Sequence, residues 1–107
     1  MAVEITKENF DQEVLQSDVP VAAFFQLPNC AKCVVFKSFA DGMEQKNAGK
    51  FKLAVFNIMK TQALAKQLGV SSTPSFIIFS QGQEENRFFG NSLVKEDIEQ
   101  AINAVIQ

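Results

Sequence analysis

The chain has 107 residues and a formal net charge of −2; 47% of its residues are hydrophobic and 21% are charged. This balance predicts a single globular domain, residues 1–107, with enough apolar residues for one core. No basic excess points to nucleic acid, and no run of about 18 apolar residues points to a membrane span. There is no histidine, which excludes a Ser-His-Asp triad and any histidine-ligated metal.

The first quarter of the chain predicts a strand, a helix and a second strand. A short strand over residues 3–5 precedes a helix in "ITKENFDQEVLQS" (residues 5–17), for which Thr6 is the expected N-cap. The predicted inward face of this helix comprises Phe10, Val14 and Leu15. Residues 20–27, "PVAAFFQL", form a continuous apolar run that is typical of a buried strand.

A long helix is predicted from Cys30 onward, because apolar residues recur there at spacings of three and four. These residues are Cys33, Phe36, Ala40 and Met43. A second buried strand over residues 51–58 and a short helix over residues 61–69 follow. Gly69 is expected to end that helix in a left-handed conformation.

The last third of the chain predicts a hairpin and a terminal helix. Strands over residues 75–80 and 85–90 flank a turn, and an amphipathic helix covers residues 93–106. Its predicted inward residues are Val94, Ile98, Ala101, Ile102 and Val105. The earlier alternation of strands and helices requires parallel pairing through crossover helices. The sequence thus predicts an α/β fold with a mixed central sheet and helices on both of its faces.

The only two cysteines, Cys30 and Cys33, lie where the predicted strand 20–27 gives way to the long helix. In open α/β sheets, ligand sites gather at the carboxyl ends of strands. The first turn of a helix has free N–H groups and the positive end of the dipole, and Lys32 adds a positive charge. We therefore expect the pKa of the Cys30 thiol to lie below that of a free thiol. The pattern favours a centre for thiol–disulfide exchange.

Two other interpretations of the cysteine pair remain open on this reasoning. A structural zinc site needs four ligands, so carboxylates or a second chain would have to complete it. The cysteines could also be small, inert residues of the core, although their place between strand and helix argues against this. No metal and no cofactor is expected in the single chain.

The sequence resembles the thioredoxin family over nearly its whole length. "PNCAKC" (residues 28–33) stands where that family has its active-site motif, and "LAKQLGVSSTPSFIIFSQGQ" (residues 64–83) is similar to its helix, loop, cis-proline and strand signature. "RFFGNS" and "LVKEDIEQAI" are similar to its last strand and terminal helix. The resemblance implies a thioredoxin fold, with a mixed sheet of four to five strands flanked by four helices in the order β-α-β-α-β-α-β-β-α.

The resemblance also implies a role for each matched residue. Cys30 would be the exposed nucleophile that attacks a substrate disulfide, and Cys33 the buried partner that resolves the mixed disulfide. Pro74 would be the cis-proline facing the sulfurs, although an ordinary trans turn remains open. An extended substrate chain would pair with backbone beside it by strand addition. The rest of the predicted substrate-binding surface is Thr73, Phe89 and Gly90, and Gly90 could equally be a plain strand-end glycine.

The motif departs from the usual Trp-Cys-Gly-Pro-Cys of that family. Asn29 replaces the tryptophan, Ala31 and Lys32 replace the Gly-Pro pair, and Pro28 stiffens the approach to the cysteines. These residues are expected to tune the pKa and the reduction potential of the couple. They also give the site a more polar, cationic rim, which predicts an altered choice of partners.

A second departure lies in the predicted core. The buried aspartate that usually assists the resolving cysteine aligns with Phe24, and its lysine partner aligns with Val55. Both polar groups are therefore missing. Deprotonation of Cys33 would rely on water, the helix dipole or Lys32.

The leading hypothesis is a cytoplasmic, monomeric thiol–disulfide oxidoreductase. It would exchange disulfides with protein substrates, be recharged by a thiol reductase, and have no nucleic-acid or membrane partner. The cytoplasm is expected because the N-terminal stretch lacks the pattern of a secretory signal. The rival hypothesis is a thioredoxin-fold module that docks a partner and uses its cysteines little or not at all. A third is a dimer that holds a metal or cluster between two cysteine pairs.

Overall fold

Five strands form one mixed sheet in the computed structural model, which describes residues 2–106. The order in the sheet is β1-β3-β2-β4-β5. β1 and β2 run parallel to β3, whereas β4 is antiparallel to both β2 and β5. This confirms the predicted mixed sheet and its C-terminal hairpin. The strands are β1 (Val3–Glu4), β2 (Val21–Gln26), β3 (Lys52–Asn57), β4 (Ser75–Ser80) and β5 (Gln83–Phe89).

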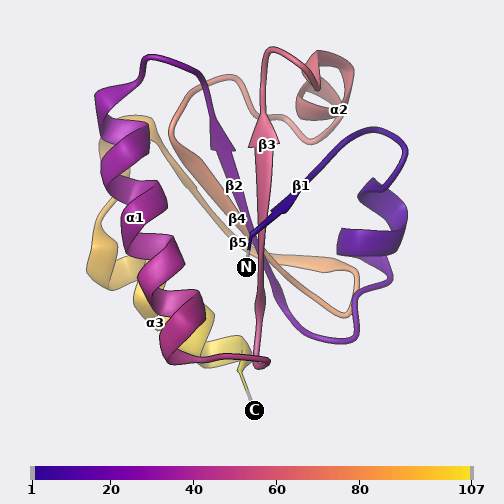
Figure 1. Ribbon diagram of the computed structural model, residues 1–107, viewed down its shortest axis with the longest axis vertical. Coiled ribbons are helices and arrows are strands. Elements are labelled where there is room, and N and C mark those ends of the chain that lie inside the picture. Colours follow the sequence, from indigo (N-terminus) through magenta and orange to yellow (C-terminus); the bar gives the residue numbers. More distant parts are fainter. Residues whose placement is uncertain (1, 107) are drawn as a thin grey trace.

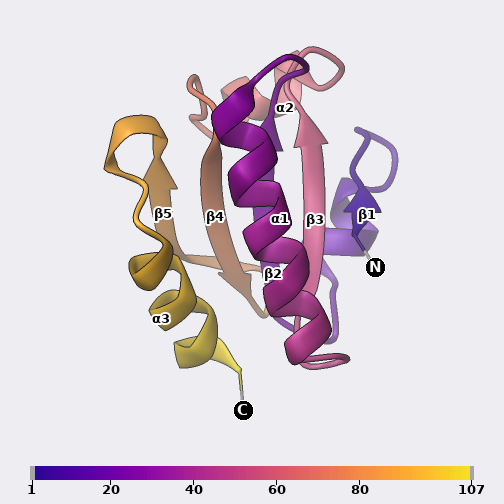
Figure 2. The same ribbon diagram turned by 60° about the vertical axis from the view of Figure 1, so that its left-hand side comes forward.

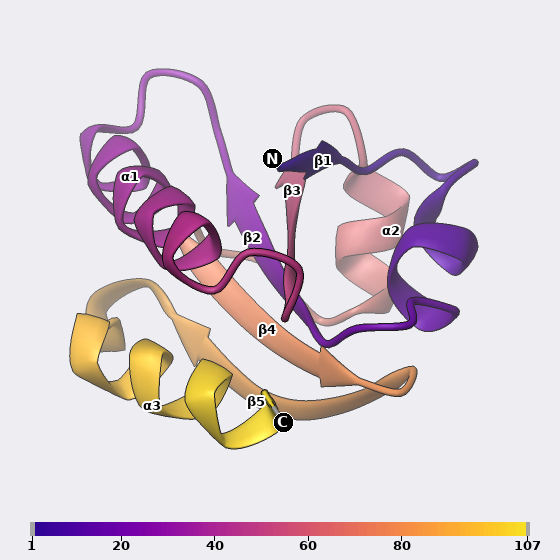
Figure 3. The ribbon, with the colours of Figure 1, turned by 60° about the horizontal axis from the view of Figure 1, so that its bottom comes forward.

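Helices cover both faces of this sheet, as predicted. The two long helices, α1 and α3, pack on one face, and Figure 2 shows them side by side in front of the strands. The opposite face carries α2 and a short π-helical segment, η1, as the views in Figure 1 and Figure 3 agree. The bounds are η1 (Asp11–Leu15), α1 (Ala31–Lys46), α2 (Gln62–Gln67) and α3 (Lys95–Val105).

The core is split into two layers because side chains of a strand alternate between the faces of the sheet. In β2, Ala22 and Phe24 point into the layer beneath α1 and α3, whereas Ala23 and Phe25 point into the layer beneath α2. Both layers are rich in phenylalanine, and Phe25 stacks on Phe56 with ring centroids 4.3 Å apart. An apolar run buried on both faces thus places β2 at the centre of the sheet.

The predicted helix over residues 5–17 is shorter and less regular than expected. The Gln16 N–H donates to the Asp11 carbonyl across five residues, at 2.8 Å, which makes the segment π-helical. The N-cap of this segment is Phe10, which has no side-chain cap, so the prediction of Thr6 as the N-cap is wrong. Thr6 lies in the turn before the segment, where its Oγ1 accepts from the Asn9 N–H at 3.2 Å. Val14 is buried as predicted, but the inward placement of Leu15 is wrong, since Leu15 is 36% exposed.

The terminal helix starts later than predicted. Val94 is the residue before α3 and is 45% exposed, so its predicted inward position is wrong. Ile98, Ala101 and Ile102 are buried as expected. A short 3-10 turn, η2 (Gly90–Ser92), joins β5 to this helix and was not predicted. Within residues 2–106, no helix combines the length and the apolar character that crossing a membrane requires.

Candidate active site

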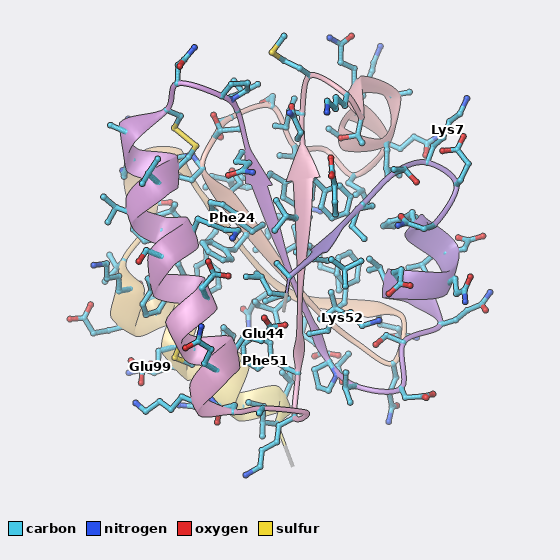
Figure 4. All side chains as sticks on the ribbon, in the orientation of Figure 1. Lys7, Phe24, Glu44, Phe51, Lys52 and Glu99 are labelled. Carbon is cyan, nitrogen blue, oxygen red and sulfur yellow. A yellow bond between two sulfur atoms is a disulfide. The ribbon has the colours of Figure 1, made fainter. Side chains whose placement is uncertain are left out.

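Cys30 and Cys33 form a disulfide at the start of α1, and Figure 4 shows it at the end of the molecule where β2 finishes. Their Cα atoms are 5.1 Å apart. Cys30 is the N-cap of α1, and its Sγ accepts a hydrogen bond from the Cys33 N–H at 3.1 Å. Cys33 is 1% exposed, whereas Cys30 is half-buried. The outer sulfur therefore lies where a helix directs its first N–H groups.

The turn between β2 and α1 explains how the chain presents Cys30. β2 ends at Gln26, and Pro28 and Asn29 are exposed in the turn that follows. Asn29 has a φ of +60°, in the left-handed region that asparagine enters more easily than most side chains. A bulky aromatic residue is less suited to that conformation, so the replacement of the family's tryptophan by Asn29 agrees with the local backbone.

An open cleft of about 700 Å³ adjoins the disulfide. It brings together the predicted residues Pro28, Asn29 and Ala31 with both cysteines. The cleft has further lining residues that were not predicted from the sequence, namely Gln26, Leu27, Val34 and Asn57. Gln26 and Asn57 are the last residues of the parallel strands β2 and β3, so the strand-end rule could have indicated them.

Lys32 links the start of α1 to the proline loop. Its Nζ donates to the Gly90 carbonyl at 3.0 Å, and the Gly90 N–H donates to the Pro74 carbonyl at 2.9 Å. The Thr73–Pro74 peptide bond is cis. The predicted residues Lys32, Thr73, Pro74 and Gly90 are thus connected to one another, although they come from three separate parts of the sequence.

Phe89 occupies the last position of β5, opposite Ser75 at the start of β4. The Arg87 guanidinium lies 5.5 Å from the centre of the Phe89 ring, within the range of a cation–π contact. Arg87 also donates to the Leu68 carbonyl at 2.9 Å, which ties β5 to the end of α2. No feature of the sequence alone had indicated this role for Arg87.

Arg87 forms an ion pair with Glu84 on the same strand. The side-chain hydrogen bond from Arg87, aided by its charge, lowers the pKa of the Glu84 carboxyl below its ordinary value, against a smaller effect of burial. The same hydrogen bond raises the pKa of Arg87. Glu84 and Arg87 therefore both stay charged at neutral pH, and the positive charge near Phe89 is largely compensated.

The positions of the family's buried aspartate and lysine are apolar in this protein. Phe24 is fully buried between the sheet and α1, where Figure 4 labels it, and its ring lies 4.8 Å from that of Phe76. Val55 is 7% exposed in the neighbouring strand and pairs with Phe24 in the parallel ladder. Both belong to the apolar layer that contains Cys33. Neither can accept a proton from the Cys33 thiol.

The part of the chain that the structure describes holds no group of three histidine, cysteine, aspartate or glutamate residues placed to bind a metal ion.

Comparison with known proteins gives a consistent family. The thioredoxin family model matches residues 1–104. Thioredoxin 1 of Nostoc sp. is 36% identical over 89 residues, which cover 83% of each chain. Thioredoxin 1 of Synechococcus elongatus is 31% identical over 90 residues, 84% of each chain. Thioredoxin M4, chloroplastic, of Arabidopsis thaliana is 32% identical over 104 residues, 94% of this chain and 53% of that protein.

The sheet topology, the Cys30–Cys33 disulfide at the start of α1 and these matches agree with one another. The chain belongs to the thioredoxin family and is a thiol–disulfide oxidoreductase with a CXXC pair.

Proposed function

We propose that Cys30 is the nucleophile and Cys33 the resolving cysteine of a protein-disulfide reductase. The observation that carries this assignment is the asymmetry of the pair. Cys30 is half-buried at the helix start and accepts the Cys33 N–H, whereas Cys33 is 1% exposed. This asymmetry supports the approach of a substrate sulfur to Cys30 and a later reaction of Cys33 with the sulfur beside it.

The exchange proceeds in two steps that balance. The Cys30 thiolate attacks one sulfur of a substrate disulfide, the substrate S–S bond breaks, and one substrate thiolate leaves. Cys33 then loses its proton and attacks the Cys30 sulfur, which forms the Cys30–Cys33 disulfide and releases the second substrate thiolate. The substrate gains two electrons and, once its thiolates are protonated, two protons. A thiol reductase must return the two electrons for the next cycle.

The substrate chain is expected to lie along Thr73 and Pro74, with Gly90 and Phe89 next to this loop at the end of β5. The Lys32–Gly90–Pro74 contacts support this placement, because they connect those backbone groups to the start of α1. Added backbone pairing would hold the substrate sulfur near Cys30. Pro28, Asn29, Ala31 and Lys32 are proposed to tune the couple from the adjoining loop.

We further propose that the protein acts in the cytoplasm, as a monomer, in electron transport that maintains the cell's redox balance. Both sulfurs and the proline loop come from one chain, so a second copy is not needed to complete the site. A reversible couple rather than a lasting disulfide suits a reducing compartment.

Reduction of insulin with dithiothreitol as electron source tests the proposed roles. Wild type is expected to accelerate the appearance of turbidity from the freed insulin chains, and the Cys30→Ser variant to lose this acceleration. In a separate incubation without dithiothreitol, the pre-reduced Cys33→Ser variant should instead accumulate a mixed disulfide with the substrate, because the second step is blocked. Mass spectrometry without reductant would detect this adduct.

The same assay separates this proposal from the rival partner-binding module. A wild type no faster than dithiothreitol alone, and indistinguishable from Cys30→Ser, would favour the module. An adduct on Cys33 in the Cys30→Ser variant, with none on Cys30 in Cys33→Ser, would reverse the two roles.

A further inference from the structure

The residues around the disulfide differ in charge from the rest of the chain. Three segments contain the pair or contribute residues to the contacts around it. Residues 26–38 contain it, residues 57–76 contribute Asn57 to its cleft, and residues 86–95 contact Lys32 through Gly90. These segments hold six of the ten cationic residues and none of the twelve carboxylates. The six are Lys32, Lys37, Lys60, Lys66, Arg87 and Lys95. These segments are thus cationic in a chain of net charge −2, and Lys32 and Lys60 are the two of these residues tied by contacts to the pair or its cleft.

Backbone contacts hold these segments together. The Ile58 N–H donates to the Gln26 carbonyl at 3.0 Å, which joins the ends of β3 and β2. Lys60 ends the turn that begins at Asn57, and its N–H donates to the Asn57 carbonyl at 2.9 Å. Figure 1 shows the loops after β2 and β3 at the same end of the sheet, and Figure 4 shows Glu99 in the half of the molecule away from the disulfide.

Not all of these cations are free to attract a partner. Lys37 pairs with Asp41 at 2.8 Å, and Arg87 pairs with Glu84. Within residues 2–106, no carboxylate pairs with Lys32, Lys60, Lys66 or Lys95, and all four are exposed.

Lys32 is the cation nearest to the chemistry, because it lies between the two cysteines. Its hydrogen bond to Gly90 fixes the ammonium group, and a neutral carbonyl does not cancel its charge. Glu4 is the carboxylate residue that lines a cleft next to the one that adjoins the disulfide. The two clefts share Gln26 and Asn57 as lining residues. The cleft lined by Glu4 does not include either cysteine.

We propose that this end of the protein selects disulfides that lie in acidic stretches of a protein substrate. The proposal rests on the proposed dithiol exchange by Cys30 and Cys33. Exposed charges act over about 10 Å at 0.1 M salt. Three residues of extended chain span about 10 Å. Lys32 beside the disulfide and Lys60 beside the cleft therefore attract carboxylates within about three residues of the substrate cysteines. This attraction raises the rate of encounter and offsets the repulsion between an acidic substrate and the Cys30 thiolate.

Single-turnover reduction of matched peptides tests this selection. The pre-reduced protein is mixed with peptides that share one intramolecular disulfide and differ only in whether glutamate, glutamine or lysine flanks it. We expect the second-order rate constant to fall in that order, with at least about a tenfold difference between the extremes at low salt. In 1 M NaCl, where screening acts within about 3 Å, the three rate constants should converge.

A pair of charge-reversal variants locates the effect. Lys60→Glu is expected to slow reduction of the glutamate peptide several-fold and to leave the glutamine peptide unaffected. Lys50→Glu makes the same change of charge on an exposed residue in the loop after α1, where it borders a separate cleft with Asp18 and Ser80. It should leave all three rate constants unchanged. Equal effects of the two variants would show that net charge, not this end of the protein, governs the rate, and would overturn the proposal.

The remaining outcomes separate the two proposals. Equal rate constants for the three peptides at low salt overturn the acidic selection while the exchange chemistry stands. Failure to reduce any peptide overturns the proposed function itself. A marked preference for glutathione disulfide, with none among the peptides, shows that a small anionic disulfide is the substrate, and overturns the assignment of a protein stretch.

Discussion

At the scale of single residues, the N-cap position of Cys30 decides how its sulfur can react. The sequence alone suggested stabilisation by the helix dipole and by Lys32, both of which act at a distance. The structure adds a specific donor, since the Cys33 N–H lies 3.1 Å from the Cys30 sulfur. Hydrogen bonds to the charged form of a group favour that form. We therefore expect the same N–H to stabilise a Cys30 thiolate in the reduced protein.

The rate of alkylation by iodoacetamide against pH should show this directly in the Cys33→Ser variant, which keeps one thiol. We expect the inflection to lie below that of a free thiol, because only the thiolate reacts. Lys32→Gln should move the inflection upward, since a nearby positive charge is removed. Free cysteine treated in parallel is the reference. An inflection at or above that of the reference would contradict the expectation.

Phe24 shows why the usual carboxylate is absent from this core. The residue is fully buried and packs against Phe76, a strand neighbour in the antiparallel pair. An aspartate there would need a charged or hydrogen-bonded partner, and the adjacent Val55 supplies none. Because both polar residues are replaced by apolar ones, neither position leaves a buried polar group without a partner. The proton of Cys33 must leave by another route, such as water in the cleft that Cys33 lines.

At the scale of whole elements, Glu44 compensates for a short edge strand. The Lys52 N–H donates to the Pro20 carbonyl on the β2 side, so the next N–H along β3, that of Leu53, points away from β2. β1 pairs only with Ala54 and Val55 and does not reach Leu53. The Glu44 carboxylate, from the last turns of α1, accepts this N–H at 3.0 Å, and Figure 4 shows it between α1 and β3. A helix side chain thus completes the edge of the sheet.

Glu44→Ala should lower the free energy of unfolding by about 1–3 kcal/mol, because the buried Leu53 N–H loses its acceptor. Glu44→Gln should cost less, since its amide oxygen can still accept. Urea denaturation followed by circular dichroism measures both. Asp41→Ala on the same helix is the control. It removes only a surface ion pair, so its effect should stay within about 1 kcal/mol. Equal losses for Glu44→Ala and Asp41→Ala would show that the contact with Leu53 contributes little.

Most of the fold could be predicted because its elements follow simple periodicities. The strands around β2 are continuous apolar runs, and the buried side of α1 follows the spacing of Cys33, Phe36 and Ala40. Periodicity predicted the ends of the helices less accurately than their interiors. Leu15 and Val94 are apolar and fit a helical spacing, but local backbone turns them outward. Single hydrogen bonds set such boundaries, and the pattern of residue types does not reveal them.

The parts of the candidate site that are neighbours in sequence could be predicted. The contacts between residues that are far apart in sequence could not. Cys30 through Cys33 are neighbours in sequence, and the strand-to-helix transition identifies their setting. The Lys32–Gly90 contact joins residues 58 positions apart, and the role of Asn57 depends on the pairing of β3 with β2. No local sequence pattern predicts these contacts, because they form only when the sheet is folded.

At the scale of the whole molecule, the disulfide should contribute little to the stability of the fold. It closes a loop with a sequence separation of three residues, and a loop that short restricts the unfolded chain by about 2 kcal/mol at most in the chain-entropy account. Cys33 is one member of the layer beneath α1 and α3, and the other layer contains neither cysteine. Opening and closing the bond is then compatible with one unchanged architecture.

We therefore expect the oxidised and reduced proteins to have the same far-ultraviolet circular dichroism spectrum. The free energy of unfolding in urea should be higher for the oxidised form by no more than about 2 kcal/mol. The variant carrying both Cys30→Ser and Cys33→Ser serves as the control and should match the reduced protein. A large change of spectrum on reduction would show that the disulfide is a structural staple.

The central place of β2 has a mechanical consequence. β2 is bonded to β3 on one side and to β4 on the other, so the strand that ends just before the Cys30 turn is held along both of its edges. A protein that is bound covalently to the Cys30 sulfur is therefore attached close to a strand that is held in place by hydrogen bonds on both edges. Whatever bending the tethered intermediate requires must then occur in the tethered protein, so compliant loops should be opened sooner than bonds held in stiff scaffolds.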